Sequence, residues 1–199
     1  MARRQGRGPR ARDDAHERPR DEPPRDPAEA AREIVLRQLS FAARTRAQLL
    51  TSLRRAGIED DVAEAVLDRY AELDLVDDEA FAQEWVTSRH SSKGLSKRAL
   101  VHELRRKGVE DEVVRAAVDV VSPEDELEAA RRLVRSRLGS VRDPDPARRA
   151  RRLVGVLARK GYGAGLAWSA VRDVLGEDIP DDVDLGVDDD PLDPFEPAE

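Results

Sequence analysis

The chain has 199 residues, of which 39% are charged and 4% are aromatic. This composition suits long amphipathic helices with wide polar faces and argues against a β-sandwich or a barrel. Because the chain contains no cysteine, disulfides, thiolate metal sites and a cysteine nucleophile are excluded, as expected for a protein of the reducing cytoplasm.

The net charge of −7 is unevenly distributed along the chain. Residues 1–27 contain eight arginines and six acidic residues, whereas residues 177–199 contain eleven acidic residues and no basic one. We therefore expect residues 1–25 to form a disordered basic arm and residues 177–199 a disordered acidic tail, since neither segment can build a core. The arm either solubilises the protein or contacts nucleic acid. The tail either maintains solubility or competes with DNA for basic surfaces.

No stretch of the sequence indicates export or membrane insertion. The charged N-terminus lacks the apolar segment of a secretory signal, and no apolar run approaches the roughly 20 residues that span a bilayer. We expect a cytoplasmic protein that does not interact with membranes.

The first three predicted helices follow recognisable capping signals. Asp26 as N-cap, Pro27 at the first position and Glu29 as the partner in a capping box predict a helix from there to about residue 39. Thr45 and Gln48 form a second capping box, which opens a helix ending at residue 57. A third helix begins near residues 59–61, with apolar residues at helical spacing: Val62, Val66, Leu67, Tyr70 and Leu73.

The second group of helices begins at a pair of carboxylates. Asp77 and Asp78 could bind Mg²⁺, but no third ligand accompanies them, so we interpret them as the cap and first turn of a helix that runs to about Ser91. Residues 91–94 read as a loop. Ser96 caps a fifth helix that ends at Gly108, and a sixth helix covers about residues 111–121.

Three further helices follow. Ser122 and Pro123 open a seventh helix that runs to about residue 139. Asp143-Pro144-Asp145-Pro146 is a hard turn whose last proline opens an eighth helix, which ends at residue 161. A ninth helix covers about residues 163–176.

Three glycines place these helices in a repeat. Gly57, Gly108 and Gly161 are 51 and 53 residues apart, and five apolar columns align around them: Leu49/Leu100/Leu153, Leu53/Leu104/Leu157, Ile58/Val109/Tyr162, Val62/Val113/Leu166 and Leu67/Val118/Val171. We predict an all-α, elongated and curved array of three tandem three-helix repeats, at residues 26–76, 77–121 and 122–176. Such arrays are stabilised by stacking of neighbouring units and commonly present a long surface to a large partner.

Basic residues also fall in register before the glycines. A solvated helix face and favourable interaction with the helix dipole account for one or two cations per helix, but less well for the cluster at residues 148–160. Our candidate partner-binding residues are Arg105, Arg106, Lys107, Arg148, Arg149, Arg152, Arg159 and Lys160.

Several segments together resemble a known family. LDLVDDEAFA at residues 73–82 is similar to an "LDD..FA" segment, residues 89–94 follow it, LVHELRRKGV at residues 100–109 is similar to "EL..KG(I/V)", and residues 160–162 match a late "KG(F/Y)" element. Their order and spacing resemble the RecX family of bacterial recombinase regulators, over about residues 28–176. The glycine- and alanine-rich stretch at residues 163–165 and the acidic tail depart from the family pattern.

The resemblance implies a tandem three-helix-repeat protein that binds RecA. Such a protein would lie in the groove of the RecA filament on single-stranded DNA, bridge protomers, and restrain filament growth, ATP hydrolysis, strand exchange and coprotease activity. It implies no catalytic residues and no cofactor, and we expect a monomer.

Two other classes of function are disfavoured by the sequence. None of His16, His90 and His102 has a triad or metal-binding spacing, and no phosphate-binding GxxxxGK[ST] loop occurs, so we expect no enzyme. A helix-turn-helix protein is disfavoured because the helices after Gly57 and Gly108 begin with acidic residues, which phosphate would repel. Non-specific DNA binding through residues 148–160, and a helical scaffold for another partner, remain as alternatives.

Overall fold

The computed structural model describes residues 26–176, so the predicted arm and tail lie outside the described residues. Within this range the chain forms nine α-helices and no strand. The helices are α1 (Pro27–Leu39), α2 (Arg46–Arg55), α3 (Asp60–Ala71), α4 (Asp78–Lys93), α5 (Lys97–Arg106), α6 (Asp111–Asp119), α7 (Pro123–Arg137), α8 (Pro146–Ala158) and α9 (Ala164–Leu175).

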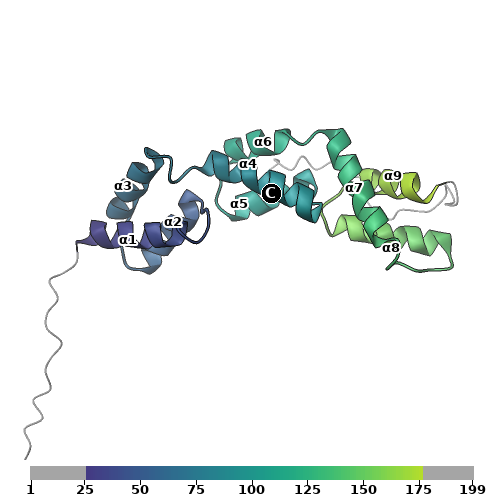
Figure 1. Ribbon diagram of the computed structural model, residues 1–199, viewed down its shortest axis with the longest axis horizontal. Coiled ribbons are helices and arrows are strands. Elements are labelled where there is room, and N and C mark those ends of the chain that lie inside the picture. Colours follow the sequence, from purple (N-terminus) through teal and green to yellow (C-terminus); the bar gives the residue numbers. More distant parts are fainter. Residues whose placement is uncertain (1–25, 177–199) are drawn as a thin grey trace, which may run out of the picture.

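The helices group into three units, each with its own core. One cluster of buried side chains joins α1, α2 and α3, a second joins α4, α5 and α6, and a third joins α7, α8 and α9. Figure 1 shows the units in a row along the long axis, bowed into an arch. The predicted all-α, elongated and curved array is confirmed.

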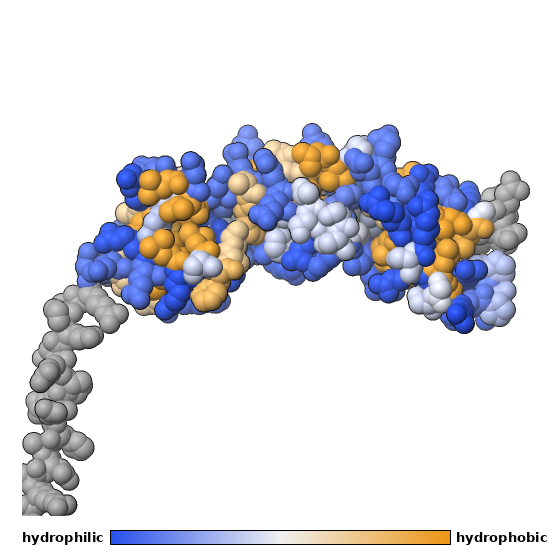
Figure 2. Space-filling view, viewed as in Figure 1, coloured by the Kyte–Doolittle hydropathy of each residue, from blue (hydrophilic) through white to orange (hydrophobic). Residues whose placement is uncertain are grey.

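Four of the five aligned apolar columns supply buried side chains to these cores, and the column five residues after the glycine is only partly buried in every unit. Both leucine columns of the second helices are fully buried in every unit, with Leu49 and Leu53 of the first unit as examples. The column after the glycine is buried at Val109 and Tyr162 but only partly at Ile58. Figure 2 shows the remaining apolar surface as separate patches between hydrophilic side chains, as expected for units with small cores.

Most capping predictions are confirmed, and three details are corrected. Asp26 accepts a hydrogen bond from the Ala28 amide at 3.0 Å instead of closing the predicted box with Glu29. The predicted loop at residues 91–94 is wrong, because α4 continues to Lys93 and ends on Gly94 in the left-handed conformation, with φ 57°. Leu73, predicted on the apolar face of the third helix, lies beyond its end and is 49% exposed.

The first and second units meet where the N-terminus of α2 contacts the C-terminal end of α5. The buried Thr45 hydroxyl donates to the Lys107 carbonyl at 2.6 Å, and the Arg46 amide donates to Asp78 Oδ1 at 2.8 Å. Gly108 lies so close to Ala47 that a Cβ on the glycine would be 2.3 Å from the Ala47 Cβ.

The second and third units meet in the same way. The Ser96 amide, at the N-terminus of α5, donates to the Lys160 carbonyl beyond the end of α8 at 3.1 Å, and the Lys97 amide donates to Glu126 Oε1 at 2.8 Å. A Cβ on Gly161 would lie 2.5 Å from Ser96 Oγ. Each join therefore brings the positive end of one helix to the negative end of another, and a carboxylate of the following unit binds the same N-terminus.

Candidate functional site

Lys107, one of the candidate partner-binding residues, lies in a cluster of cations and aromatic rings on the central unit. Its ammonium Nζ is 3.9 Å from the centre of the Trp85 ring and 5.5 Å from that of Phe81. The Arg89 guanidinium carbon is 4.0 Å from the Trp85 ring centre. The two rings stack with centroids 5.6 Å apart and an interplanar angle of 17°.

Helix geometry explains how this cluster forms. Phe81, Trp85 and Arg89 are each four residues apart on α4, so they lie on one face of that helix. Lys107 reaches them from the C-cap of α5, which packs against α4. We call Phe81, Trp85, Arg89 and Lys107 the cation–aromatic cluster.

The electrostatics of the cluster are dominated by positive charge. Partial burial, followed by the nearby Arg89, lowers the pKa of Lys107, and Arg44 and Arg106 add to that effect. The carboxylate of Glu103 opposes it: Glu103 accepts a hydrogen bond from Trp85 Nε1 at 2.8 Å and lies 3.9 Å from Arg89 Nε. Two cations, Arg89 and Lys107, therefore lie over one indole ring, and the Glu103 carboxylate binds the indole N–H beside them.

The other two candidates on α5 differ from Lys107. Arg105 pairs with Asp111, with Nε and Oδ1 2.8 Å apart, as Arg54 pairs with Asp60 at the same place in the first unit. The pair lowers the pKa of Asp111 through its hydrogen bond with Arg105. The repeated basic residue thus links two helices within a unit. Arg106 is exposed to solvent beside it.

The candidate cations at the start of α8 are partly neutralised. Arg148 Nε lies 2.8 Å from Asp145 Oδ2, and Arg152 lies 3.3 Å from Asp143, whose side chain is only 6% exposed. The hard turn before α8 therefore supplies counter-charges to this pair. These contacts depend on the path of the turn, so the sequence did not reveal them. Counting the cations of residues 148–160 along the sequence therefore gave more unpaired positive charge than the structure has.

The remaining candidates in the third unit have other surroundings. Arg159 is exposed and Lys160 is half-buried, and neither forms an ion pair within residues 26–176. Arg149 is half-buried, and its Nε is enclosed without a hydrogen-bond partner among the described residues. The structure thus places the candidates in two groups, one on the central unit and one on the third.

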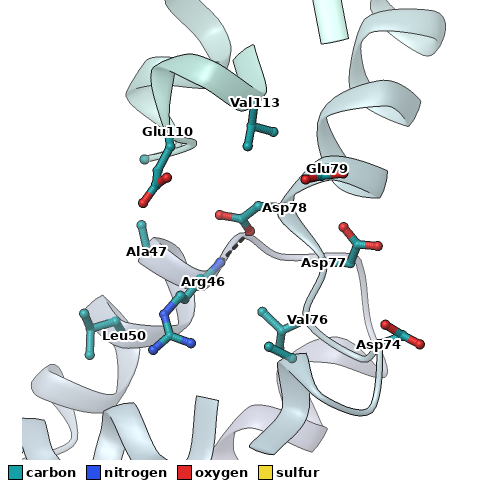
Figure 3. A pocket seen from close by; sticks show the side chains of 12 residues that line it. Arg46, Ala47, Leu50, Asp74, Val76, Asp77, Asp78, Glu79, Glu110 and Val113 are labelled. Atoms are coloured by element: carbon teal, nitrogen blue, oxygen red, sulfur yellow. Dashed lines mark hydrogen bonds between the residues drawn. The ribbon is translucent and has the colours of Figure 1, made fainter. Parts of the chain in front are cut away.

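A second surface, at the join between the first two units, is acidic. The groove there has a volume of about 630 Å³. Figure 3 shows the carboxylates of Asp74, Asp77, Asp78, Glu79 and Glu110 around it. Arg46 donates its backbone amide to Asp78, while its guanidinium binds Asp68 and Glu64 outside the groove. Burial raises the pKa of Asp78 against the opposing hydrogen bond from Arg46.

The carboxylates at the start of α4 have structural roles. Asp77 accepts the Ala80 amide at 2.8 Å, which confirms its predicted role as an N-cap. Among the residues from 26 to 176, no three His, Cys, Asp or Glu side chains are grouped so that they could hold a metal ion. No helix of that same range is long and apolar enough to cross a membrane.

The cation–aromatic cluster was not among the sequence predictions. Phe81 and Arg89 entered them only within the segments 73–82 and 89–94 that carry the family resemblance, and Trp85 did not enter them. The four-residue spacing of these side chains was a usable signal. The approach of Lys107 was not, because it depends on how α5 packs against α4.

Comparison with known proteins identifies the family. Models of the first, second and third three-helix domains of RecX match residues 31–69, 77–118 and 124–171. The regulatory protein RecX of Thermobifida fusca is 54% identical over 152 residues, covering 76% of this chain and 82% of that protein. The RecX of Streptomyces coelicolor is 50% identical over 165 residues, covering 83% and 88%.

Solved structures show the same fold. The crystal structure of RecX from Lactobacillus salivarius matches with a TM-score of 0.68 at 18% identity, covering 75% of this chain and 97% of that one. A second crystal structure of a regulatory protein RecX matches with a TM-score of 0.67 at 22% identity, covering 74% of each chain. With matches to all three domains and close relatives along most of its length, this chain belongs to the RecX family of regulatory proteins.

Proposed function

We propose that this protein binds the RecA filament on single-stranded DNA and inhibits the recombinase, ATPase and coprotease activities of RecA. Membership of the RecX family supports a regulatory role. The observation that carries the proposal is the arch itself: two joins of one design hold three units in a row, as in Figure 1. A long, fixed surface of this kind suits contact with successive protomers of a filament.

The candidate cations are proposed to supply part of the filament contact. Arg106, Arg159 and Lys160 are the strongest of them because no carboxylate within the described residues pairs with them. Arg148 and Arg152 must exchange their internal carboxylates for a partner's, so each should contribute less. Such exposed charges act mainly on encounter rate and specificity.

The test is RecA ATPase on single-stranded DNA, with this protein titrated well below equimolar. Strong inhibition at low ratios is expected, since one bound molecule would restrain many protomers. No inhibition at any ratio would exclude the proposal. In that case, salt-sensitive binding to bare DNA would favour a DNA-binding protein. If the protein did not bind bare DNA either, a scaffold for another partner would be favoured.

Charge reversals test the contact residues. Arg148→Glu with Arg152→Glu should weaken filament binding while helicity by circular dichroism is retained, and Arg159→Glu with Lys160→Glu should weaken it more. The matched control, Arg37→Glu with Arg69→Glu on the first unit, makes the same change in net charge on exposed helix positions. Equal binding by all three variants would remove these cations from the interface.

A further inference from the structure

The three units differ in charge. Residues 122–176, the third unit, contain twelve basic and seven acidic residues. Residues 26–76 contain seven basic and ten acidic residues, and residues 77–121 contain eight and nine. The third unit is therefore the strongly positive part of the described chain. The acidic tail, residues 177–199, follows this unit directly and has eleven carboxylates and no basic residue.

The positive charge of the third unit is concentrated on one exposed side of α8. Arg148, Arg151 and Arg152 lie there in the first two turns, and Arg159 continues the same side at the C-cap. The opposite side of the helix supplies three fully buried side chains to the core: Ala150, Leu153 and Leu157. The four arginines therefore form a stripe directed away from the core, which we call the arginine face.

Contacts within the described residues leave the arginine face positive. Two of its arginines pair with carboxylates of the turn before α8. Arg151 and Arg159 form no ion pair with any residue from 26 to 176. In addition, the first turn of α8 contains no acidic residue, whereas that of α7 contains three. Because the helix dipole is positive at this end, cations there repel it, and an anion bound to them would relieve the repulsion.

The chain leaves the third unit close to this face. α8 and α9 are consecutive helices that pack against each other, and Figure 1 shows the end of α9 and the start of α8 at the same end of the unit. The tail begins after Gly176, the C-cap of α9. An extended residue spans up to ~3.3–3.6 Å, and a helix of 13 residues is only about 20 Å long. About six residues of the tail therefore suffice to follow the whole arginine face.

We propose that residues 177–199 bind within the same chain to the arginine face of α8 and mask it in the free protein. Carboxylates form strong charge-assisted hydrogen bonds with guanidinium groups. Attachment to α9 gives the tail a local concentration on the order of millimolar, so that individually weak pairs act together. A partner that uses the same arginines must first displace the tail. The docking does not depend on the proposed function, and only its effect on RecA rests on that function.

The absence of cysteine allows the tail to be labelled at a single introduced site. A nitroxide spin label on Gly186→Cys in the full chain should broaden the NMR amide signals of residues 146–159 at low salt, relative to those of α2. The broadening should weaken in 1 M NaCl, where the Debye length is about 3 Å. Attachment alone brings the label near α8 at any salt concentration. Equal broadening at both salt concentrations, or none at either, would overturn the proposal.

Removal of charge tests which groups hold the tail. The tail variant neutralises three neighbouring carboxylates: Asp188→Asn, Asp189→Asn and Asp190→Asn. The matched control makes the same change in net charge at exposed positions of the first unit: Glu29→Gln, Glu33→Gln and Glu59→Gln. With the same spin label, the tail variant should broaden α8 less than the parent does, and the control should match the parent. Equal broadening in all three proteins would contradict the proposal.

A mixed sample tests whether the contact lies within one chain. Isotope-labelled parent protein without a spin label is mixed with spin-labelled protein that carries no isotope. The α8 signals should keep their intensity, because each tail occupies its own α8. Broadening as strong as in the single-chain sample would replace the proposal by a contact between two copies.

RecA ATPase separates this inference from the proposed function. If the parent inhibits RecA, the tail variant should do so at a concentration about 3-fold lower or less, since three exposed pairs no longer compete. Equal potency of the two would mean that the tail does not mask the contact surface. A parent that fails to inhibit RecA but shows salt-sensitive broadening of α8 would overturn only the proposed function. Inhibition without any such broadening would overturn only the inference.

Discussion

The three glycine turns that define the repeat have the same backbone conformation but different surroundings. Gly57, Gly108 and Gly161 have φ of 79°, 80° and 89°, a region that side chains other than glycine rarely adopt. A Cβ on Gly57 would meet nothing within 4 Å, whereas on Gly108 or Gly161 it would collide with the N-terminus of the preceding unit's second helix. The same residue thus ends a helix in all three units and also holds a join in two.

This difference follows from position in the array. The first unit has no predecessor among the described residues, so the C-terminal end of α2 receives no helix. The ends of α5 and α8 each receive one, through the carbonyls of Lys107 and Lys160. A glycine that occurs at the same place in every unit can therefore be required for two reasons, its left-handed backbone conformation and the close contact at a join. Only the first reason applies in the first unit.

The largest expected effect comes from alanine at the join glycines. Gly108→Ala and Gly161→Ala should each lower the free energy of unfolding by about 2–5 kcal/mol, from left-handed strain and overpacking together. Gly57→Ala suffers only the strain and should lose about 1–2 kcal/mol. Urea unfolding of the three variants measures the difference. Equal losses would mean that the joins accommodate a methyl group and are looser than the structure shows.

The next effect concerns the carboxylates that bind the helix N-termini across the joins. Asp78→Ala and Glu126→Ala each remove the acceptor of a backbone amide, Arg46 or Lys97. Each should lose about 1–2 kcal/mol, as for the loss of an N-cap or a charged hydrogen bond. Glu124→Ala, in the same first turn as Glu126 but exposed, is the control and should change thermal stability little. If Glu124→Ala lowered thermal stability as much as Glu126→Ala, the effect would come from the loss of negative charge near the helix N-terminus and not from the contact across the join.

The stability of the join between the first two units should also depend on pH. Burial raises the pKa of Asp78 above its usual 3.8. The folded protein therefore binds this proton more tightly than the unfolded chain does, and the residue's contribution to stability falls as pH rises from about 3.8 through the raised pKa. Asp78→Asn keeps an acceptor but does not ionise, so its stability relative to the parent should increase over that range. A constant difference in unfolding free energy between pH 4 and 7 would contradict this.

The smallest effect is expected at an ion pair that occurs at the same place within each of the first two units. Arg54→Ala and Arg105→Ala break equivalent pairs, with Asp60 and Asp111, whose carboxylates remain exposed to water. Both variants should retain near-parental stability, because exposed pairs contribute little. The local effect is clearer: the lowered pKa of Asp111 should return to its usual range in Arg105→Ala, as followed by NMR titration. The Arg105–Asp111 pair contributes to stability above pH 3.8, and this contribution is lost as pH falls through the lowered pKa of Asp111. Any stability loss of Arg105→Ala relative to the parent should therefore occur above that range, and a loss seen only at acid pH would contradict the prediction.

Much of this fold was predictable because its signals are local. Caps at Thr45, Asp77, Ser96 and Ser122 involve residues three positions apart, and the leucine columns repeat with the helix period. Of the candidate site, the sequence indicated where cations cluster along the chain. It did not indicate which of them are paired internally, because Arg152 meets Asp143 only through the path of a turn.

The sequence by itself determined the nine helices of residues 26–176 and the turns that end them, since each depends on contacts within a few residues, and the spacing of the three glycines indicated their grouping in threes. Only the tertiary structure decided how the units join, because Thr45 and Lys107 meet across 62 residues of chain. It also decided that Lys107 lies against Trp85 while Arg105 faces Asp111. Neighbouring cations on one helix end point toward different helices, and only the packing of those helices gives each cation its partner.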